Sequence, residues 1–249
     1  MKNKVILIVF LIFLFYLVFR DIIYTFYPVE SHGEWAYRDI VMNIPRLLCL
    51  ISIIFVQKWK KFESVAKVST IGKKYTFYIG ILLISLIPLR SLFVDTQRLQ
   101  SDLIVWIIVG SFLVGFFEEG LFRGLFFDSL KQQNGTFVAV LFSTLLFSLF
   151  HIGVVPVNEL PTIFLIGIIF ALLRDKNVSL FMLSLLHAFY DGFIMFWLPV
   201  SSLTPLWITI EMLCLGIIAI CFYLWTEKDC FRNWNSRLNH AKNCFIKSK

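Results

Sequence analysis

The sequence of 249 residues has few charged side chains, because only 16% are Asp, Glu, Lys or Arg whereas 59% are hydrophobic. Soluble domains are typically about 45–50% apolar, so this chain is not an ordinary soluble domain. The same composition excludes an intrinsically disordered chain and a nucleic-acid-binding module. A mean hydropathy of +0.81 is typical of a protein whose main solvent is lipid.

Paired cysteines are also missing. The five cysteines form no C-x-x-C motif and no zinc-finger spacing with histidines. This excludes a disulfide framework, and we expect reduced thiols that act as small hydrophobic side chains.

Long apolar runs are abundant instead, and a membrane-spanning helix needs about 20 such residues. The first run follows two lysines but precedes no small-residue cleavage site, which favours a retained helix over a signal peptide. We therefore predict an all-α, polytopic membrane bundle of about eight transmembrane helices in three parts: 1–102, a core at 103–200, and 201–249. The predicted spans are 4–20, 40–57, 76–94, 103–127, 136–155, 160–173, 178–200 and 204–225.

The net charge of +7 predicts an orientation. With eight alternating spans, 18 of the 23 Lys and Arg residues fall on one side and four on the other. Because Lys and Arg concentrate in cytoplasmic loops, both termini are predicted to be cytoplasmic. The basic loop from Lys58 to Lys74 and the basic tail from Lys228 to Lys249 are predicted to rest on anionic lipid.

A few ionisable residues lie inside the predicted spans, where each is costly and needs a reason. Residues four apart share a helix face, so Glu119 is expected to face Arg123, and His187 to face Asp191. Glu118 is then free to point elsewhere. Phe147 lies one turn before His151 and is expected to shield that imidazole from lipid. A free carboxylate and two imidazoles suffice to activate water.

Other interpretations of these residues remain open. They could be polar contacts between helices, as membrane bundles use, or a proton relay in a carrier. A carrier usually has interrupted segments in matching halves, which this chain lacks. Two further charges in the spans, Arg46 and Glu211, are expected to form a structural ion pair because they have similar predicted depths.

Three ordered motifs carry a family resemblance: Glu-Glu-x-x-x-Arg at 118–123, Phe-x-x-x-His at 147–151 and His-x-x-x-Asp at 187–191. Across roughly residues 103–200, the chain resembles the CPBP family, which comprises the Ras-converting type of CAAX prenyl proteases and their bacterial relatives, also called Abi proteins. The resemblance implies an intramembrane endopeptidase with an all-helical core.

The resemblance also implies residue roles. Glu118 and His151 would activate water, and His187 would stabilise the oxyanion, while Glu119 and Arg123 would orient the site. Asp191 stands at a family position occupied by Asn or Asp. Because a carboxylate repels an oxyanion, we assign Asp191 to orienting His187.

Two further expectations follow from this resemblance. Glu118, His151 and His187 could form a zinc shell with an open position, although no H-E-x-x-H motif is present and we favour catalysis without obligatory zinc. The bacterial branch of the family implies a plasma-membrane protein acting on a small hydrophobic or membrane-bound peptide, in bacteriocin immunity or peptide-pheromone processing. A non-catalytic immunity or regulatory scaffold of the same fold is the alternative.

Straight, evenly centred helices would leave one difficulty. They would place Glu118 and His151 about 10 Å or more apart in depth. The site therefore requires a tilted helix or a shifted span boundary.

Overall fold

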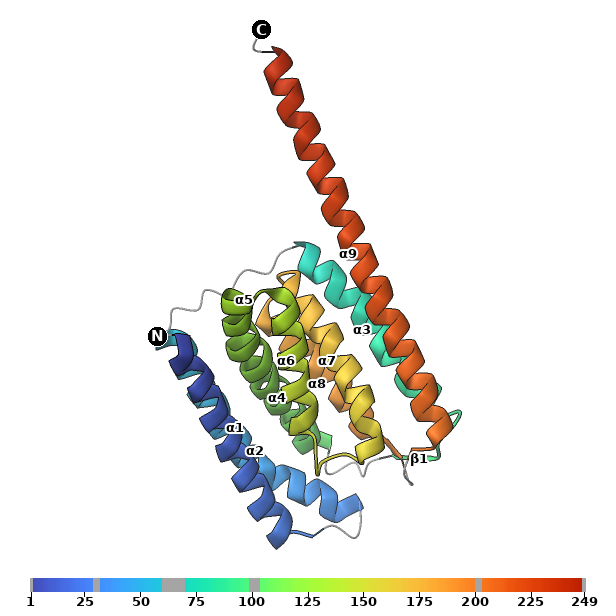
Figure 1. Cartoon of the computed structure of the whole chain (residues 1–249). Helices are drawn as coiled ribbons and strands as arrows, with labels where there is room; N and C mark the ends of the chain where they lie inside the picture. The colour runs from blue at the N-terminus through green and yellow to red at the C-terminus, as the bar shows by residue number, and fades with distance from the viewer. Residues whose placement is uncertain (1, 29–31, 60–69, 99–103, 200–202, 248–249) are drawn as a thin grey trace.

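The structure is a computed structural model that describes residues 2–28, 32–59, 70–98, 104–199 and 203–247. Helices dominate the described residues (Figure 1), which confirms the all-α membrane fold. The helices are α1 (Lys2–Phe26), α2 (His32–Trp59), α3 (Thr70–Arg90), α4 (Ile104–Glu119), the π-helix η3 (Gly120–Phe127), α5 (Asp128–Asn134), α6 (Thr136–Phe150), the 3-10 turn η4 (Val157–Glu159), α7 (Leu160–Asp175), α8 (Leu180–Phe196) and α9 (Pro205–Lys247).

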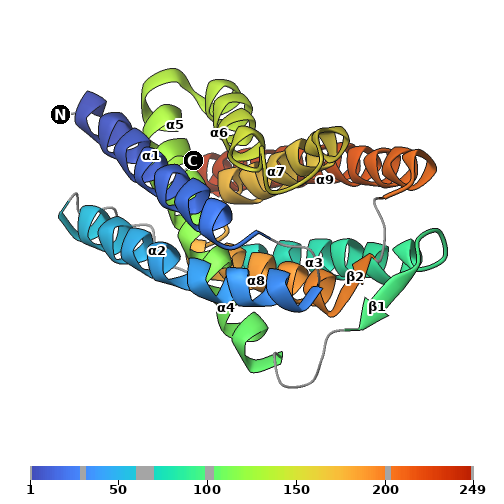
Figure 2. The ribbon, with the colours of Figure 1, turned by 90° about the horizontal axis from the view of Figure 1, so that it is seen from below.

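Two three-residue strands are the described exceptions to the helical fold. β1 (Thr96–Arg98) pairs antiparallel with β2 (Trp197–Pro199), with Gln97 opposite Leu198. β1 follows α3 and β2 directly follows α8. The short ladder therefore joins the ends of these two helices at one end of the bundle (Figure 2).

Six helical segments among the described residues are long and apolar enough to cross a membrane. Two shorter apolar helices, Thr136–Phe150 and Leu180–Ile194, complete the eight predicted segments. Large apolar side chains such as Leu11, Phe55 and Leu213 are exposed on the outer helix faces. Such a surface suits lipid rather than water, so the chain is a multi-pass membrane protein.

The helix α4 lies at the centre of the bundle beside α8, with α1 and α2 on one side and α3 and α9 on the other (Figure 2). Gly115 permits the close approach of α4 and α8. A Cβ atom at this position would lie 2.5 Å from the Ser184 carbonyl oxygen and 2.8 Å from the Ala188 nitrogen.

The apolar interior is divided into two large clusters. One joins α1, α2, α4, η3 and α6, with Phe117 and Phe150 among its buried members. The other joins α3, α7, α8 and α9, with Leu183 and Tyr190 among its buried members. The polar residues predicted to form the site come from helices of both clusters, so they meet at the seam between the two halves.

Several predicted span boundaries were wrong. α1 and α2 extend beyond the predicted 4–20 and 40–57, and α3 ends at Arg90 rather than at residue 94. α6 ends at Phe150, which places His151 outside the helix. α8 ends before β2, and α9 continues through most of the predicted tail.

Both chain ends lie toward the same end of the bundle (Figure 1). This agrees with an even number of crossings, while the cytoplasmic location of that end stays a prediction. The middle of the basic loop, residues 60–69, lies outside the described residues, as do the side chains of the basic tail. Their contact with anionic lipid and the three-part division of the chain also remain predictions.

Candidate active site

The centre of the site is the junction of α4 and η3. Glu118 and Glu119 end α4, and Arg123 lies in the π-helix that follows. π-helical turns are rare and are frequent at functional sites. All eight residues of η3 are buried, so neighbouring helices enclose this π-helical segment on every side.

Glu119 and Arg123 form the predicted pair, and both side chains are fully buried. Arg123 Nη1 lies 3.1 Å from Glu119 Oε1. Nη2 of Arg123 donates to the Gly167 carbonyl oxygen at 3.1 Å, and the guanidinium stacks over the Phe147 ring at 4.3 Å. The same Glu119 oxygen accepts a hydrogen bond from His187 Nδ1 at 2.9 Å. Glu119, itself held by Arg123, therefore fixes the orientation of the His187 ring through Nδ1, while Nε2 faces Glu118.

His151 follows the last residue of α6. Its Nδ1 lies 2.9 Å from the Phe147 carbonyl oxygen, which can only accept a hydrogen bond, so Nδ1 carries the proton. The Phe147 ring also contacts the imidazole, with centroids 4.8 Å apart. This arrangement leaves the lone pair of Nε2 directed into the site, 3.9 Å from Glu118 Oε2.

The short α6 resolves the expected difference in depth between Glu118 and His151. Its 15 residues span roughly 22 Å, less than the hydrocarbon core of about 30 Å. The helix therefore ends inside the bundle, at the level of Glu118, rather than at residue 155. The early end of α6 is therefore the shifted span boundary that brings His151 to the depth of Glu118.

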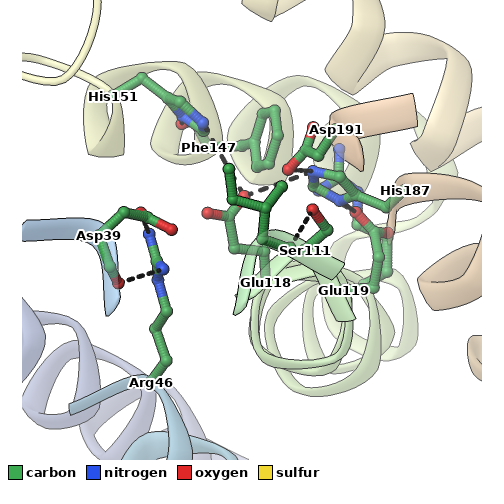
Figure 3. A network of polar contacts seen from close by, with 11 residues as sticks. Asp39, Arg46, Ser111, Glu118, Glu119, Phe147, His151, His187 and Asp191 are labelled. Atoms are coloured by element: carbon green, nitrogen blue, oxygen red, sulfur yellow. Dashed lines mark hydrogen bonds and ion pairs between the residues drawn. The ribbon is translucent and has the colours of Figure 1, made fainter. Parts of the chain in front are cut away.

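The four residues proposed from the motifs come together around Glu118 (Figure 3). Glu118 Oε2 lies 3.8 Å from His187 Nε2, and the same nitrogen lies 3.5 Å from Asp191 Oδ2. Glu118 is 4% exposed, and its Oε2 has no hydrogen-bond partner within the described part of the chain. A buried carboxylate oxygen without a partner lacks the stabilisation that native structures normally provide.

A cavity of about 240 Å³ opens beside these residues. It is large enough for several water molecules. Glu118, His151 and Asp191 line it, together with residues of α1, α2, α3, α7 and α9. His187 and Glu119 lie behind these lining residues, with His187 Nε2 3.8 Å from Glu118 Oε2.

The zinc shell suggested by the resemblance does not fit well. A tetrahedral zinc with bonds of about 2.0–2.1 Å holds its ligand atoms roughly 3.3 Å apart. The two imidazole nitrogens lie 3.9 and 3.8 Å from Glu118 Oε2. Among the described residues, no group of three or more His, Cys, Asp or Glu side chains is arranged to hold a metal ion.

The expected pair between Arg46 and Glu211 was wrong. Arg46 Nη2 binds Asp39 Oδ1 at 2.6 Å, two turns earlier on α2, and Nη1 lies 3.1 Å from Asn43 Oδ1. An arginine side chain is long enough to reach back along its own helix, which the comparison of depths across spans ignored. Arg46 and Glu211 do line the same cavity (Figure 3 shows Arg46 near Glu118).

Sequence reasoning missed several residues near the site. Tyr16 and Tyr24 of α1, and Arg90 at the end of α3, line the cavity. Arg20 of α1 contacts the segment that carries His151. Arg20 and Arg90 carried a signal, since both belong to long apolar segments, but only the orientation of the chain was inferred from them. The two tyrosines resemble ordinary aromatic residues of a membrane helix, so the sequence gave no signal that they lie at the site.

The fold and this site together define a helical membrane protein with a buried glutamate–histidine centre suited to hydrolysis. The family model of the Rce1-like type II CAAX prenyl endopeptidases matches residues 100–193, which contain all three motifs. The chain therefore contains an Rce1-like region, as the motifs indicated. This region supports an intramembrane peptidase of the CAAX protease type with a membrane-associated peptide substrate. No curated protein matches the chain.

Proposed function

We propose that this protein is an intramembrane endopeptidase in which Glu118 and His151 activate the attacking water. The observation that carries the proposal is the buried, unpartnered Oε2 of Glu118, which faces the Nε2 atoms of both histidines beside a cavity. A water molecule within hydrogen-bond distance of both Glu118 Oε2 and His151 Nε2, about 2.8 Å from each, fits their separation of 3.9 Å.

In the first step, this water attacks the carbonyl carbon of the scissile bond and gives a proton to Glu118. The carbonyl oxygen becomes negatively charged. His187, whose Nδ1 proton is held by Glu119, stabilises this oxygen by donating a hydrogen bond from Nε2, and it keeps its proton throughout the step. Asp191, 3.5 Å from Nε2, orients the ring.

In the second step, the carbon–nitrogen bond breaks and Glu118 returns its proton to the leaving amine. One carboxylate thus serves first as general base and then as general acid. Glu118, beside the His151 imidazole, carries out both proton transfers. The two steps therefore use only side chains of this protein and the attacking water.

The substrate that we propose is a small hydrophobic or membrane-bound peptide, in bacteriocin immunity or peptide-pheromone processing at a bacterial plasma membrane. The family resemblance supports this class. A cavity lined by residues of membrane-spanning helices supports it too, because the site then lies at the depth of a membrane-embedded peptide.

Two site variants and one control test the proposal. Glu118→Gln keeps the side-chain volume but removes the base, and His151→Ala removes its partner. Glu227→Gln makes the same chemical change at a half-exposed residue of α9, which pairs with Lys176. Mass spectrometry of membrane peptides should show uncleaved peptides accumulating in cells with either site variant but not with the control.

The same variants should lower the peptidase activity of the purified protein by about 10²–10⁴-fold, the usual contribution of a general base. Normal accumulation of both site variants in the membrane, combined with full function, would show that the peptidase proposal is wrong. That result would favour a non-catalytic scaffold.

A further inference from the structure

We infer that Arg20 of α1 is a positioning residue that holds His151 in the proposed site. The inference rests on the proposed function, because it assigns Arg20 a role in placing His151, a residue of the proposed site. Arg20 lies outside the region that matches the family model.

The guanidinium of Arg20 binds the chain on both sides of His151. Its Nη1 donates to the Phe150 carbonyl oxygen at 3.1 Å and to the Ile152 carbonyl oxygen at 2.9 Å. These residues are 130 and 132 positions away in the sequence. One nitrogen therefore ties α1 to the residue before His151 and to the residue after it.

Asp21 fixes the orientation of the guanidinium. Its Oδ1 accepts hydrogen bonds from Nε and Nη2 of Arg20 at 3.0 and 2.9 Å. This planar arrangement leaves Nη1 directed at the two carbonyl groups. Arg20 is only 8% exposed, so little water competes for these contacts. A lysine at this position would keep the positive charge but would lack the planar, rigid set of N–H donors.

The contacted carbonyl groups need such a partner. The last four carbonyl groups of an α-helix accept no hydrogen bond within the helix. They carry a partial negative charge, which a nearby cation stabilises. α6 ends at Phe150, so the Phe150 carbonyl is one of these groups, and the Ile152 carbonyl follows it in the loop. Arg20 thus supplies a cap for the helix end from which His151 extends.

The rest of the loop is already organised around His151. Its carbonyl oxygen accepts hydrogen bonds from the backbone nitrogens of Val154 and Val155 at 2.9 and 3.1 Å. Gly153 adopts a φ of 81°, which closes this tight turn. Arg20 is the side chain that connects the turn to a neighbouring helix through the carbonyls on either side of the imidazole.

Removing Arg20 should therefore move His151 relative to Glu118 without unfolding the bundle. We expect Arg20→Met, which retains much of the apolar stem, to lose these contacts, and Arg20→Lys to retain part of the effect. Arg38→Met is the matched control. Arg38 contacts α1 one turn from Arg20, where its guanidinium lies over the Tyr24 ring at 3.8 Å.

The first measurement is hydrogen–deuterium exchange of the purified protein in detergent, which needs no substrate. In Arg20→Met, the amides of Val154 and Val155 should exchange about tenfold faster, while those of α4 and α8 stay unchanged. Arg38→Met should leave the loop as in the unsubstituted protein. Unchanged exchange in Arg20→Met, or equal acceleration in every helix, would overturn the inference.

The second measurement is cleavage of a quenched fluorogenic peptide of mainly hydrophobic residues, which represents the proposed substrate class. Arg20→Met should lower kcat by about 10- to 100-fold with little change in KM, because a displacement of about 1 Å disturbs chemistry more than binding. Arg20→Lys should restore part of the loss. Full kcat in Arg20→Met would contradict the inference.

Glu118→Gln separates the two proposals. If it cleaves the peptide as fast as the unsubstituted protein, the proposed function fails whatever Arg20 does. If it is inactive while Arg20→Met keeps full activity and normal exchange, only the role of Arg20 fails.

Discussion

Replacing Gly115 with alanine should separate α4 from α8 and disrupt the site that lies between them. The added Cβ atom would lie 2.5 Å from the Ser184 carbonyl oxygen and 2.8 Å from the Ala188 nitrogen. Both are backbone atoms, which cannot rotate away as a flexible side chain can. An ordinary contact needs about 3.4 Å, so the helices must move apart by about 0.9 Å.

This displacement affects stability and activity to different extents. Overpacking of a close contact costs about 1–3 kcal/mol, and the higher helix propensity of alanine offsets at most about 1 kcal/mol of this. The bundle should therefore fold with reduced stability. Glu118 lies on α4 and His187 on α8, so their separation of 3.8 Å should increase directly. A shift near 1 Å can lower a rate about 10²-fold.

Two assays on purified protein in detergent separate these effects. Thermal unfolding measures the loss of stability, and cleavage of the fluorogenic peptide at a temperature where the protein stays folded measures the loss of rate. Gly216→Ala is the matched control, since a Cβ atom there meets nothing within 4 Å. It should be as active as the unsubstituted protein and at least as stable.

The reasoning would be refuted if Gly115→Ala matched Gly216→Ala in both assays. Such a result would mean that α4 and α8 can separate without changing the distances around Glu118. A loss of stability with full activity in the folded protein would refute the part of the argument that links this contact to the site.

Three other predictions concern buried charges and metal ions. Arg123→Met should destabilise the protein by about 3–5 kcal/mol because Glu119 is left as a buried charge without its partner; thermal unfolding measures this, and Glu119→Gln in the same chain should restore part of the stability. Asp39→Asn should lower stability because Arg46 loses its ion pair of 2.6 Å, and equal unfolding temperatures would contradict that contact. Peptidase activity should persist after treatment with a strong chelator; loss of activity that zinc alone restores would show that a metal is required.

The sequence predicted the fold class because length and hydropathy strongly restrict what can cross a bilayer. It located all eight apolar segments among the described residues, although their ends were displaced. Boundaries such as that of α6 are also accompanied by contacts from distant residues, since Arg20 of α1 donates to the carbonyl oxygen of its last residue. Nothing in the local sequence of α6 indicates that contact.

Within the candidate site, the sequence predicted contacts along one helix better than contacts between helices. The spacing of four residues correctly paired Glu119 with Arg123 and His187 with Asp191. It could not show that Glu119 also binds His187, because that contact joins α4 to α8.

Arg46 shows the opposite error. Its partner Asp39 lies on the same helix, seven positions earlier, while the prediction sought a partner in another span. Similar depth in a membrane is weak evidence for contact, since eight helices offer many residues at each level. The reach of a long side chain along its own helix was the stronger constraint.

The seam between the two apolar clusters has a mechanical consequence. Glu118 and His151 belong to the half formed with α1 and α2, whereas His187 and Asp191 belong to the half formed with α3 and α9. The close backbone contact of α4 and α8 at Gly115 crosses this seam, so it fixes the register of the two halves and with it the distance between Glu118 and His187.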